Sequence, residues 1–270
     1  MILLGLLGNP LSKSLSPDIF SYISEKKKIE IEFNLFETSN PEETVKELKK
    51  LSYNGFFITT PFKERLYNIL KPELRFTDFN IINCVKLSAS DVLATNTDFI
   101  AVKRLSSGFD FKNKTALILG SGGTAITSLY LLRTSGIKKV YISARNLTRA
   151  AEIKKRFDDI DIEIFAFNKY FKEYDILINA TPVGMYCDER IVADFSNTEL
   201  VIDWAYTSGI TELVKNARAN NVKTISGIEI LVSQALIGLK FISGYDFFED
   251  KDEIIDQIKS KRNSDQWRMI

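Results

Sequence analysis

The sequence predicts an α/β fold with two domains, the first of which is built on a mainly parallel sheet. The 270 residues suffice for two ordinary domains of about 100 to 150 residues each. Short apolar, β-prone runs alternate with segments of helical periodicity along almost the whole chain, as in α/β proteins. Near the middle, a strand-like run at 115–119 leads through three glycines into a helix start. We expect the first domain at 1–100, completed by helices at about 229–270, and the second domain at 101–228.

The composition is that of a globular chain without a nucleic acid or a membrane as partner. Hydrophobic residues make up 45% of the chain and charged residues 26%, and the net charge is +1. No apolar run approaches the roughly 20 residues that cross a bilayer. The cysteines, Cys84 and Cys187, are too few for a disulfide framework, so we expect free thiols and a cytoplasmic protein.

Histidine is absent from the sequence. This excludes a Ser-His-Asp triad, a histidine-ligated zinc and a histidine general base. Proton chemistry therefore has to use Lys, Asp, Glu, Tyr or Cys, and we expect no metal site.

Strands and helices alternate through the first hundred residues. Ser16 is a natural N-cap and Pro17 a first helical residue of one helix. Thr60 and Pro61 are expected in the same positions of a later helix, which places Lys63 in its first turn. The strands are expected at 2–8, 30–38, 55–59, 80–87 and 91–96.

Polar side chains follow these strands. Ser14 and Ser16 point to one side of an extended segment beside a helix N-terminus, where a carboxylate is well received, although simple capping alone explains Ser16. Lys63 is placed against the helix dipole at the carboxyl end of a strand, where open α/β sheets bind ligands; a solvated surface lysine is the alternative. Asp98 at a helix start is either a dipole-matched acid or a functional one. We expect one rim to collect Ser14, Thr59, Lys63, Asn83 and Asp98.

The second half opens on T-A-L-I-L-G-S-G-G-T-A at 115–125. Its glycines leave no Cβ in the way, so a pyrophosphate can lie against the amides of the helix N-terminus, although an ordinary βα turn has the same pattern. Further strands are expected at 138–145, 161–167, 175–181, 201–206 and 222–227, with helices at 147–157, 211–220, 228–244 and 249–262. This succession indicates a Rossmann-type dinucleotide-binding domain.

The end of the second strand of such a domain distinguishes the two nicotinamide dinucleotides. An acid there binds the ribose 2′-hydroxyl of NAD, whereas a basic residue accommodates the 2′-phosphate of NADP. The chain lacks an acid at 143–146 and has Arg145 and Arg149, which could clamp a phosphate. NADP(H) is therefore the expected cofactor.

Seven motifs along nearly the whole chain occur in the order and spacing of the shikimate dehydrogenase family, which the sequence resembles. They are S-L-S-P at 14–17, T-x-P-F-K at 59–63, N-T-D at 96–98, G-x-G-G at 120–123, N-A-T-P-x-G-M at 179–185, D-x-x-Y at 203–206 and S-G-I…L-V-x-Q-A at 226–235.

The resemblance implies NADPH-dependent reduction of 3-dehydroshikimate to shikimate in aromatic amino-acid biosynthesis, by a monomer or homodimer with a cleft between its substrate domain and its cofactor domain. It implies that Lys63 and Asp98 are catalytic. The residues implied for the substrate are Ser14, Ser16 and Tyr206 at its carboxylate, and Thr59, Asn83 and Gln234 at its ring hydroxyls. Those implied for NADP are Gly120, Ser121, Gly122, Gly123, Thr124, Ala144, Arg145, Arg149, Thr181, Trp204 and Gly227.

Several positions depart from the family pattern. They are Lys13 for histidine, Phe57 for asparagine, Cys84 for threonine, Phe99 for a small residue, and A-R-N for N-R-T at 144–146. Two alternatives remain open: a sister enzyme that prefers quinate or an aminoshikimate, and a silent relative that binds dinucleotide or shikimate as a sensor. Retention of both Lys63 and Asp98 argues against the sensor.

Overall fold

The computed structural model describes residues 1–71, 80–88, 91–167, 173–185, 190–207 and 209–263, and the chain divides into two compact units. Unit 1 comprises Met1–Ile100 and the chain from Val232 onward, and unit 2 comprises Ala101–Leu231. Cys187 and the predicted connection at 89–90 lie outside the described residues.

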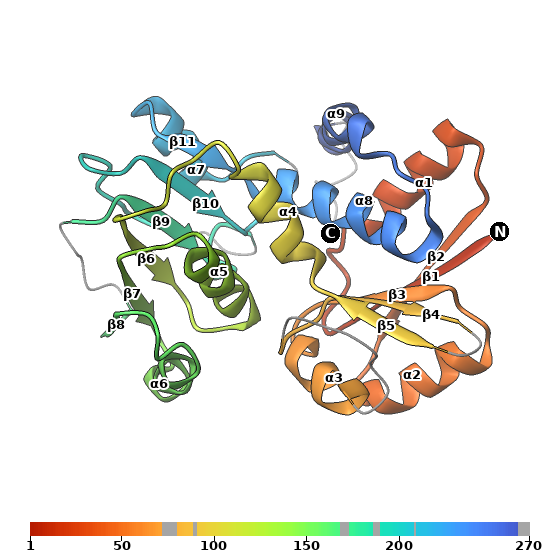
Figure 1. Ribbon diagram of the computed structural model, residues 1–270. Coiled ribbons are helices and arrows are strands. Elements are labelled where there is room, and N and C mark those ends of the chain that lie inside the picture. Colours follow the sequence, from red (N-terminus) through yellow and green to blue (C-terminus); the bar gives the residue numbers. More distant parts are fainter. Residues whose placement is uncertain (72–79, 89–90, 168–172, 186–189, 208, 264–270) are drawn as a thin grey trace. The chain divides into compact units, whose positions relative to one another are not determined.

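Unit 1 is built on a five-stranded sheet in the order β2-β1-β3-β4-β5 (Figure 1). Its strands are β1 (Ile2–Gly8), β2 (Ile31–Glu37), β3 (Gly55–Ile58), β4 (Cys84–Leu87) and β5 (Val92–Thr95). β1 is parallel to β2 and β3, while β4 is antiparallel to β3 and to β5, so four of the five strands run in one direction. The predicted, mainly parallel sheet is confirmed.

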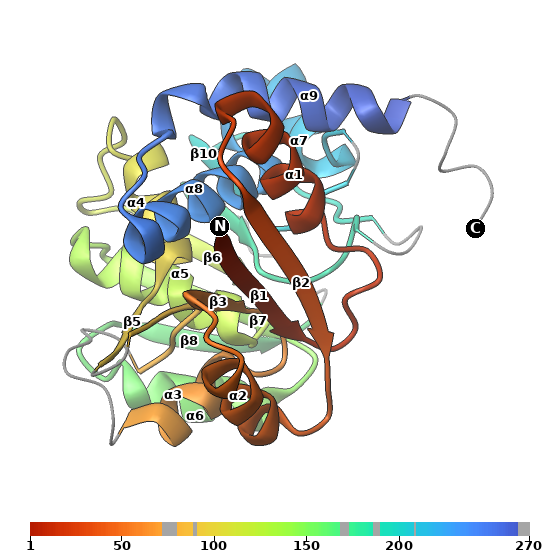
Figure 2. The ribbon, with the colours of Figure 1, turned by 90° about the vertical axis from the view of Figure 1, so that its right-hand side faces the viewer.

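Helices cover both faces of this sheet. They are α1 (Ser16–Lys27), α2 (Pro41–Lys50), α3 (Lys63–Leu70), the part of α8 (Gly227–Ser243) from Val232 onward, the short 3₁₀ helix η2 (Phe248–Asp250) and α9 (Lys251–Asn263). α2 and α3 lie on one face, and α1 and α8 on the other (Figure 2). α9 lies against α1, where the Tyr22 hydroxyl donates to Glu253 (2.5 Å). Lys27 of α1 pairs with Asp250 of the preceding η2 (2.7 Å).

The core of unit 1 explains one departure from the family pattern. On the α1 side of the sheet, the Phe57 ring lies 5.4 Å from the ring of Phe20, which stacks on Phe33 at 4.5 Å. A Cβ at Gly238 of α8 would come within 2.2 Å of the Phe57 ring. Phe57 is therefore packed into the core, and α8 approaches it closely because position 238 is glycine.

Unit 2 is built on six strands in the order β11-β10-β9-β6-β7-β8, and every neighbouring pair is parallel. Numbered within the unit, this is the order 3-2-1-4-5-6 of a Rossmann sheet, and the strand order reverses between β6 and β9. The strands are β6 (Thr115–Leu119), β7 (Lys139–Ala144), β8 (Ile162–Ala166), β9 (Ile176–Asn179), β10 (Leu200–Asp203) and β11 (Lys223–Ile225). The Rossmann-type prediction is confirmed.

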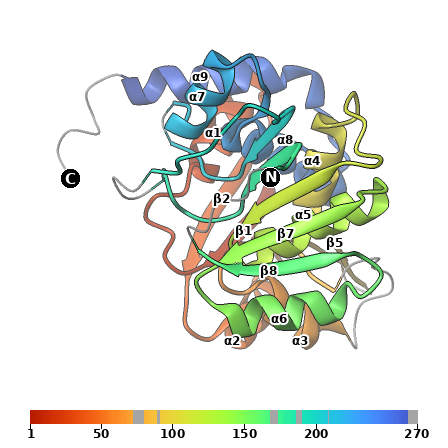
Figure 3. The same ribbon diagram turned by 90° about the vertical axis from the view of Figure 1, so that its left-hand side faces the viewer.

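The helices α4 (Thr97–Leu105), α5 (Gly123–Thr134), α6 (Leu147–Arg156) and α7 (Glu212–Ala219) connect these strands or lead into them. Figure 3 shows β7 and β8 side by side, with α6 packed beside them. β9 and β10 are buried along their whole length, because helices cover both faces of a parallel sheet.

Two predicted helix N-caps, Ser16 and Thr60, are wrong. α1 begins at Ser16, with Leu15 as its N-cap residue, and α3 begins at Lys63, after Phe62. Leu15 is 0% exposed and Phe62 is 5% exposed, so burying an apolar side chain at these positions prevailed over side-chain capping. Thr60 and the cis-linked Pro61 precede the helix.

Most strands are shorter than predicted, and hydrogen bonds explain two of the larger differences. The strand expected at 80–87 begins at Cys84, because the amide of Ile82 donates to the Lys63 carbonyl instead of to a neighbouring strand (3.4 Å). The strand expected at 201–206 ends at Asp203, whose side chain accepts a hydrogen bond from the amide of Ala205 (3.0 Å).

No helix in the described part of the chain is both long enough and apolar enough to cross a membrane. Within the same residues, no three acidic or cysteine side chains are grouped as ligands for a metal ion.

Candidate active site

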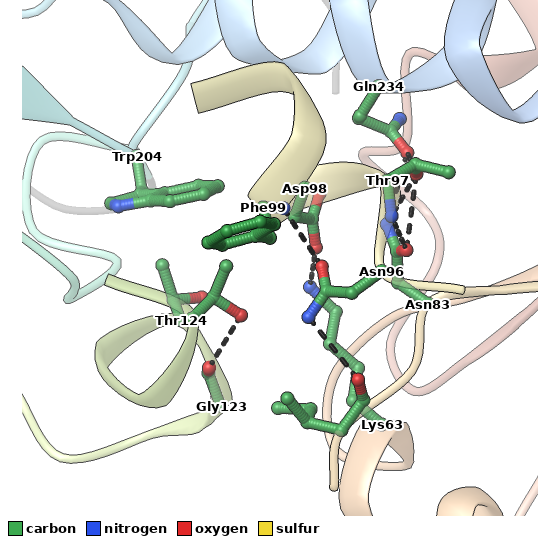
Figure 4. Close-up of polar contacts among 12 residues, drawn as sticks. Lys63, Asn83, Asn96, Thr97, Asp98, Phe99, Gly123, Thr124, Trp204 and Gln234 are labelled. Carbon is green, nitrogen blue, oxygen red and sulfur yellow. Dashed lines mark hydrogen bonds and ion pairs between the residues drawn. The ribbon is translucent and has the colours of Figure 1, made fainter. Parts of the chain in front are cut away.

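Lys63 and Asp98 form a largely buried ion pair in unit 1 (Figure 4). Lys63 Nζ lies 2.6 Å from Asp98 Oδ2, and the two side chains are 14% and 11% exposed. Asp98 is in the first turn of α4, where a helix dipole favours an acid, whereas Lys63 is the first residue of α3, where the dipole opposes a cation. The ion pair therefore compensates the unfavourable position of the lysine.

Asn96 fixes the start of α4 and thus the position of Asp98. Its Oδ1 accepts a hydrogen bond from the amide of Phe99 (2.9 Å), as an N-cap side chain does, and its Nδ2 donates to the Ile81 carbonyl (3.3 Å). Asn96 is 1% exposed, so this cap is held within the core. The carboxylate two residues later is therefore carried by a capped and buried helix start.

Asn83, Thr97 and Gln234 form a second polar group in unit 1. Asn83 Oδ1 accepts from the Thr97 amide (2.6 Å), and Asn83 Nδ2 donates to the Thr97 hydroxyl (2.9 Å). The Gln234 amide oxygen lies 3.2 Å from the Thr97 hydroxyl and 3.4 Å from Asn83 Nδ2. All three residues are buried. Because Thr97 contacts both Asn83 and Gln234, it connects the two residues that were predicted to bind the substrate ring.

Strand direction explains why these residues meet. Cys84 of β4 is in register with Phe57 of β3 and with Thr95 of β5. Because β4 runs against its two neighbours, its first residue lies at the edge of the sheet where β3 and β5 end. Asn83 immediately precedes β4, and its backbone bonds to Ile58 (2.8 Å) and Thr95 (3.2 Å).

The two predicted serines neighbour each other at the start of α1. Ser14 Oγ accepts a hydrogen bond from the amide of Ser16 (3.3 Å), so Ser14, and not Ser16, supplies the side-chain oxygen at this helix N-terminus. Thr59 follows β3, and its amide donates to the Leu7 carbonyl of β1 (2.8 Å). Tyr206, which was predicted to share the carboxylate with the serines, belongs to unit 2.

The glycine turn after β6 leaves the N-terminus of α5 open. Gly120 has φ of 106°, and a Cβ there would lie 2.9 Å from the Ala180 carbonyl oxygen, so both backbone angle and space require glycine. Gly122 is the N-cap residue in an extended conformation, and a Cβ there would meet no atom within 4 Å. The amides at Gly123 and Thr124 begin the helix behind this space. The turn fits a pyrophosphate.

The end of β7 lies beside this turn, since the Gly120 amide donates to the Ser143 carbonyl (2.8 Å) and Ser121 Oγ donates to the Asn146 carbonyl (3.4 Å). Asn146 caps α6 by accepting from the Arg149 amide (2.9 Å).

Two cations follow Ala144, the last residue of β7. The Arg145 guanidinium lies over the Phe167 ring at 5.2 Å from its centroid, and Arg149 Nη1 pairs with Glu152 at 3.1 Å. The Phe167 amide donates to the Ala144 carbonyl (3.1 Å), which holds the ring next to the arginine. Two cations and a capped helix N-terminus fit a 2′-phosphate.

The ends of β9 and β10 are joined by a polar pair that sequence reasoning left without a role. Asp203 is in register with Asn179 on the neighbouring strand, and Asn179 Nδ2 donates to Asp203 Oδ1 (2.8 Å). The predicted cofactor residues Thr181 and Trp204 lie two residues after the end of β9 and one residue after the end of β10. A Cβ at Gly227 would lie 2.3 Å from the Ala205 carbonyl oxygen.

Thr97, Phe167, Asn179 and Asp203 are the residues of the site that sequence reasoning missed. The signal for Asn179 and Asp203 was a polar residue closing a fully apolar run, I-L-I-N and L-V-I-D. Thr97 stood inside the quoted N-T-D motif, whereas Phe167 carried no local signal.

Two family models match the chain. The model described as the shikimate dehydrogenase substrate binding domain matches residues 6–85, and the model described as shikimate / quinate 5-dehydrogenase matches residues 100–231. A relative from Caldicellulosiruptor bescii, named shikimate dehydrogenase (NADP(+)), is 34% identical over an alignment of 248 residues. The match covers 86% of this chain and 85% of the relative.

Solved structures are similar over almost the full length. A chorismate mutase/shikimate 5-dehydrogenase fusion protein from Clostridium acetobutylicum has a TM-score of 0.82 at 28% identity, over 98% of this chain and 99% of that one. A shikimate dehydrogenase solved in complex with NADP+ has a TM-score of 0.79 at 25% identity, over 96% of both chains.

Proposed function

The chain belongs to the shikimate dehydrogenase family, and we propose that it catalyses the reversible NADPH-dependent reduction of 3-dehydroshikimate to shikimate, a step of chorismate and aromatic amino-acid biosynthesis. The family models and the relative confirm the resemblance that the seven motifs indicated. The chain is an oxidoreductase that acts on a small-molecule secondary alcohol with NADP(H) as its cofactor.

The Lys63–Asp98 ion pair is the observation that carries the proposed chemistry. Bound NADPH supplies the hydride that reduces the ketone. Reduction develops negative charge on the ketone oxygen, and the Lys63 ammonium is the group that donates a proton to it. Asp98 accepts a hydrogen bond from Lys63 Nζ at 2.6 Å and keeps the ammonium oriented. The pair needs neither a metal nor a histidine, in a chain that contains no histidine.

The substrate is assigned to unit 1. Ser14 and Ser16, next to the N-terminus of α1, are proposed to bind the carboxylate together with Tyr206 of unit 2, since amides and hydroxyls at a helix N-terminus suit an anion. Ring hydroxyls are assigned to Thr59 and to the amides of the buried polar group described above, Asn83 and Gln234.

NADP(H) is assigned to unit 2. The open N-terminus of α5 supports the assignment of the pyrophosphate to the glycine turn, and the stacked Arg145 supports that of the 2′-phosphate. The residues proposed are Gly120, Ser121, Gly122, Gly123, Thr124, Ala144, Arg145 and Arg149, with Thr181, Trp204 and Gly227 at the nicotinamide. A cleft between the units, a cytoplasmic location and a monomeric or homodimeric state stay predictions.

A substrate panel tests this function. Oxidation of NADPH and of NADH is followed with 3-dehydroshikimate and, separately, with 3-dehydroquinate. We expect the highest kcat/KM with NADPH and 3-dehydroshikimate. Faster turnover with 3-dehydroquinate would instead indicate the quinate-preferring sister enzyme, and no turnover with any combination would leave only the sensor.

A further inference from the structure

Asp203 is a fully buried carboxylate that the proposed chemistry does not use. It is 0% exposed, and three donors surround it. Asn179 Nδ2 (2.8 Å) and the Ala205 amide (3.0 Å) donate to Oδ1, while the Thr211 hydroxyl donates to Oδ2. All three donors are neutral. Burial raises the pKa of Asp203 to about 6, against the opposing effect of these hydrogen bonds.

The three donors come from three different segments of unit 2. Asn179 ends β9, Ala205 follows β10, and Thr211 is the N-cap residue of α7, where its hydroxyl also accepts from the Val214 amide (3.3 Å). One carboxylate therefore ties together the ends of two neighbouring strands and the start of a helix. An apolar residue at this position would remove the acceptor of all three hydrogen bonds and leave the buried Ala205 amide without a partner for its N–H.

Asn179 extends the network into the loop after β9. Its Oδ1 accepts from the amide (3.0 Å) and the hydroxyl (2.6 Å) of Thr181, and its Nδ2 also donates to the Val183 carbonyl (3.2 Å). The amide of Asn179 is oriented by Asp203, because the carboxylate accepts only from its NH₂ end. The path of residues 180–183 thus depends on Asp203.

The loop after β10 depends on Asp203 as well. The Trp204 amide donates to the Asn179 carbonyl (3.0 Å), and the next amide, of Ala205, donates to Asp203 itself. The Trp204 indole then reaches α5, where its Nε1 donates to Ser128 Oγ (3.0 Å). The hydrogen bond from the Ala205 amide to the Asp203 carboxylate therefore fixes the direction in which residues 204–206 leave the sheet.

We propose that Asp203 is a positioning residue: it holds the segments that carry Thr181, Trp204 and Tyr206 in the arrangement that binds nicotinamide and substrate carboxylate. Asp203 acts through Asn179, Ala205 and Thr211 and contacts neither ligand. This inference rests on the proposed function for the roles of Trp204 and Tyr206, whereas the hydrogen-bonded network stands without it.

The test uses Trp204 as a probe of its own loop. The chain has two tryptophans, and the second, Trp267, lies outside the described residues. In a Trp267→Phe background, acrylamide quenching of Trp204 fluorescence and the KM and kcat for 3-dehydroshikimate with NADPH are measured for Asp203→Ala, Asp203→Asn and Thr211→Val.

Asp203→Ala is expected to raise the quenching constant at least twofold and the KM for 3-dehydroshikimate at least tenfold. Asp203→Asn is expected to rescue both, because its Oδ1 still accepts from Asn179 and Ala205 while its NH₂ donates to the Thr211 hydroxyl. Thr211→Val removes one of the three hydrogen bonds and is expected to change the quenching constant and the KM in the same direction by a smaller amount. This variant tests the proposal if Asp203→Ala does not fold.

Thr198→Val is the matched control. Thr198 is also buried (8% exposed) and precedes the opposite end of β10, where its hydroxyl donates to the Asp194 carbonyl (3.2 Å). It is expected to lower Tm without changing the quenching or KM. If the Asp203 and Thr211 variants likewise lower only Tm, the positioning role is overturned.

Failure of the proposed function gives a different result. The Trp267→Phe parent would then show no turnover with 3-dehydroshikimate, while the quenching of Trp204 would still report whether Asp203 holds the loop.

Discussion

The ammonium of Lys63 lies 2.6 Å from a carboxylate oxygen of Asp98, and each residue stands in the first turn of a different helix. α3 and α4 follow β3 and β5, which end at the same edge of the sheet of unit 1. A charge pair held in this way is positioned by strand register and by the Asn96 cap, and does not depend on a flexible loop. The following predictions extend from this pair to the groups around it.

Thr97 connects Asn83 to Gln234, so removing its hydroxyl should disturb both substrate-binding amides. Thr97→Val is expected to cost about 1–3 kcal/mol of the free energy of unfolding, because it leaves buried polar groups unpaired. It should also raise the KM for 3-dehydroshikimate about tenfold without changing that for NADPH, and Thr97→Ser should restore both.

Ser106→Ala is the control for this variant. It removes a buried hydroxyl from the other end of α4, where Ser106 Oγ donates to the Val102 carbonyl (2.7 Å). It should lower Tm and leave KM unchanged. Equal effects of the two variants on KM would refute a specific role for Thr97.

Arg145 is expected to set the preference for NADP over NAD. Arg145→Ala should raise the KM for NADPH about tenfold to hundredfold, because one or two charge-assisted hydrogen bonds to a phosphate are lost. The KM for NADH should change little. Steady-state kinetics with both cofactors measure this. Lys155→Ala, an exposed charge on α6, is the control, and a parallel rise for NADH would argue against a 2′-phosphate site at Arg145.

The two glycines of the turn after β6 should respond differently to alanine. At Gly122 the backbone is extended and a Cβ meets no atom within 4 Å, so Gly122→Ala should keep the wild-type Tm but raise the KM for NADPH by filling the space for the pyrophosphate. At Gly120, φ of 106° and the Ala180 carbonyl at 2.9 Å make alanine destabilising. A lowered Tm for Gly122→Ala, or an unchanged KM, would contradict this distinction.

The raised pKa of Asp203 predicts how the free energy of unfolding depends on pH. Its pKa is raised from 3.8 to about 6, so the folded state binds the proton more tightly than the unfolded state does. Asp203 therefore destabilises the fold progressively as pH rises from about 4 to about 6, by on the order of 3 kcal/mol in total, and its effect is constant above that range.

The difference in urea unfolding free energy between wild type and Asp203→Asn, measured from pH 4.5 to 7.5, isolates this effect. The wild type should lose stability relative to Asp203→Asn up to about pH 6. A difference that is independent of pH would mean that Asp203 is ionised throughout.

The strands of both sheets could be predicted because runs of apolar residues in the local sequence indicate buried strands. Runs such as T-A-L-I-L and D-I-L-I-N are apolar over their whole length, as strands buried on both faces are. Helix starts were less predictable. Ser16 and Thr60 have the chemistry of N-caps, but the burial of Leu15 and Phe62 decided where α1 and α3 begin.

The polar groups of the site were predictable only in part, because most of their partners are distant in the chain. Asn83 and Gln234 are 151 residues apart, and nothing near either residue indicates that Thr97 lies between them. The pairing of Asn179 with Asp203 likewise depends on the register of β9 against β10. The edge at which Asn83 meets Thr97 depends on the reversed direction of β4, which short apolar runs do not specify.

The kcat of Lys63→Ala tests the central claim most directly. With 3-dehydroshikimate and NADPH at saturation, loss of the proton donor should lower kcat by about two or more orders of magnitude, while the affinity for NADPH stays nearly unchanged. Lys71→Ala, which removes an exposed cation at the other end of α3, should keep the wild-type kcat. A wild-type kcat in Lys63→Ala would remove Lys63, and with it the Lys63–Asp98 pair, from the mechanism.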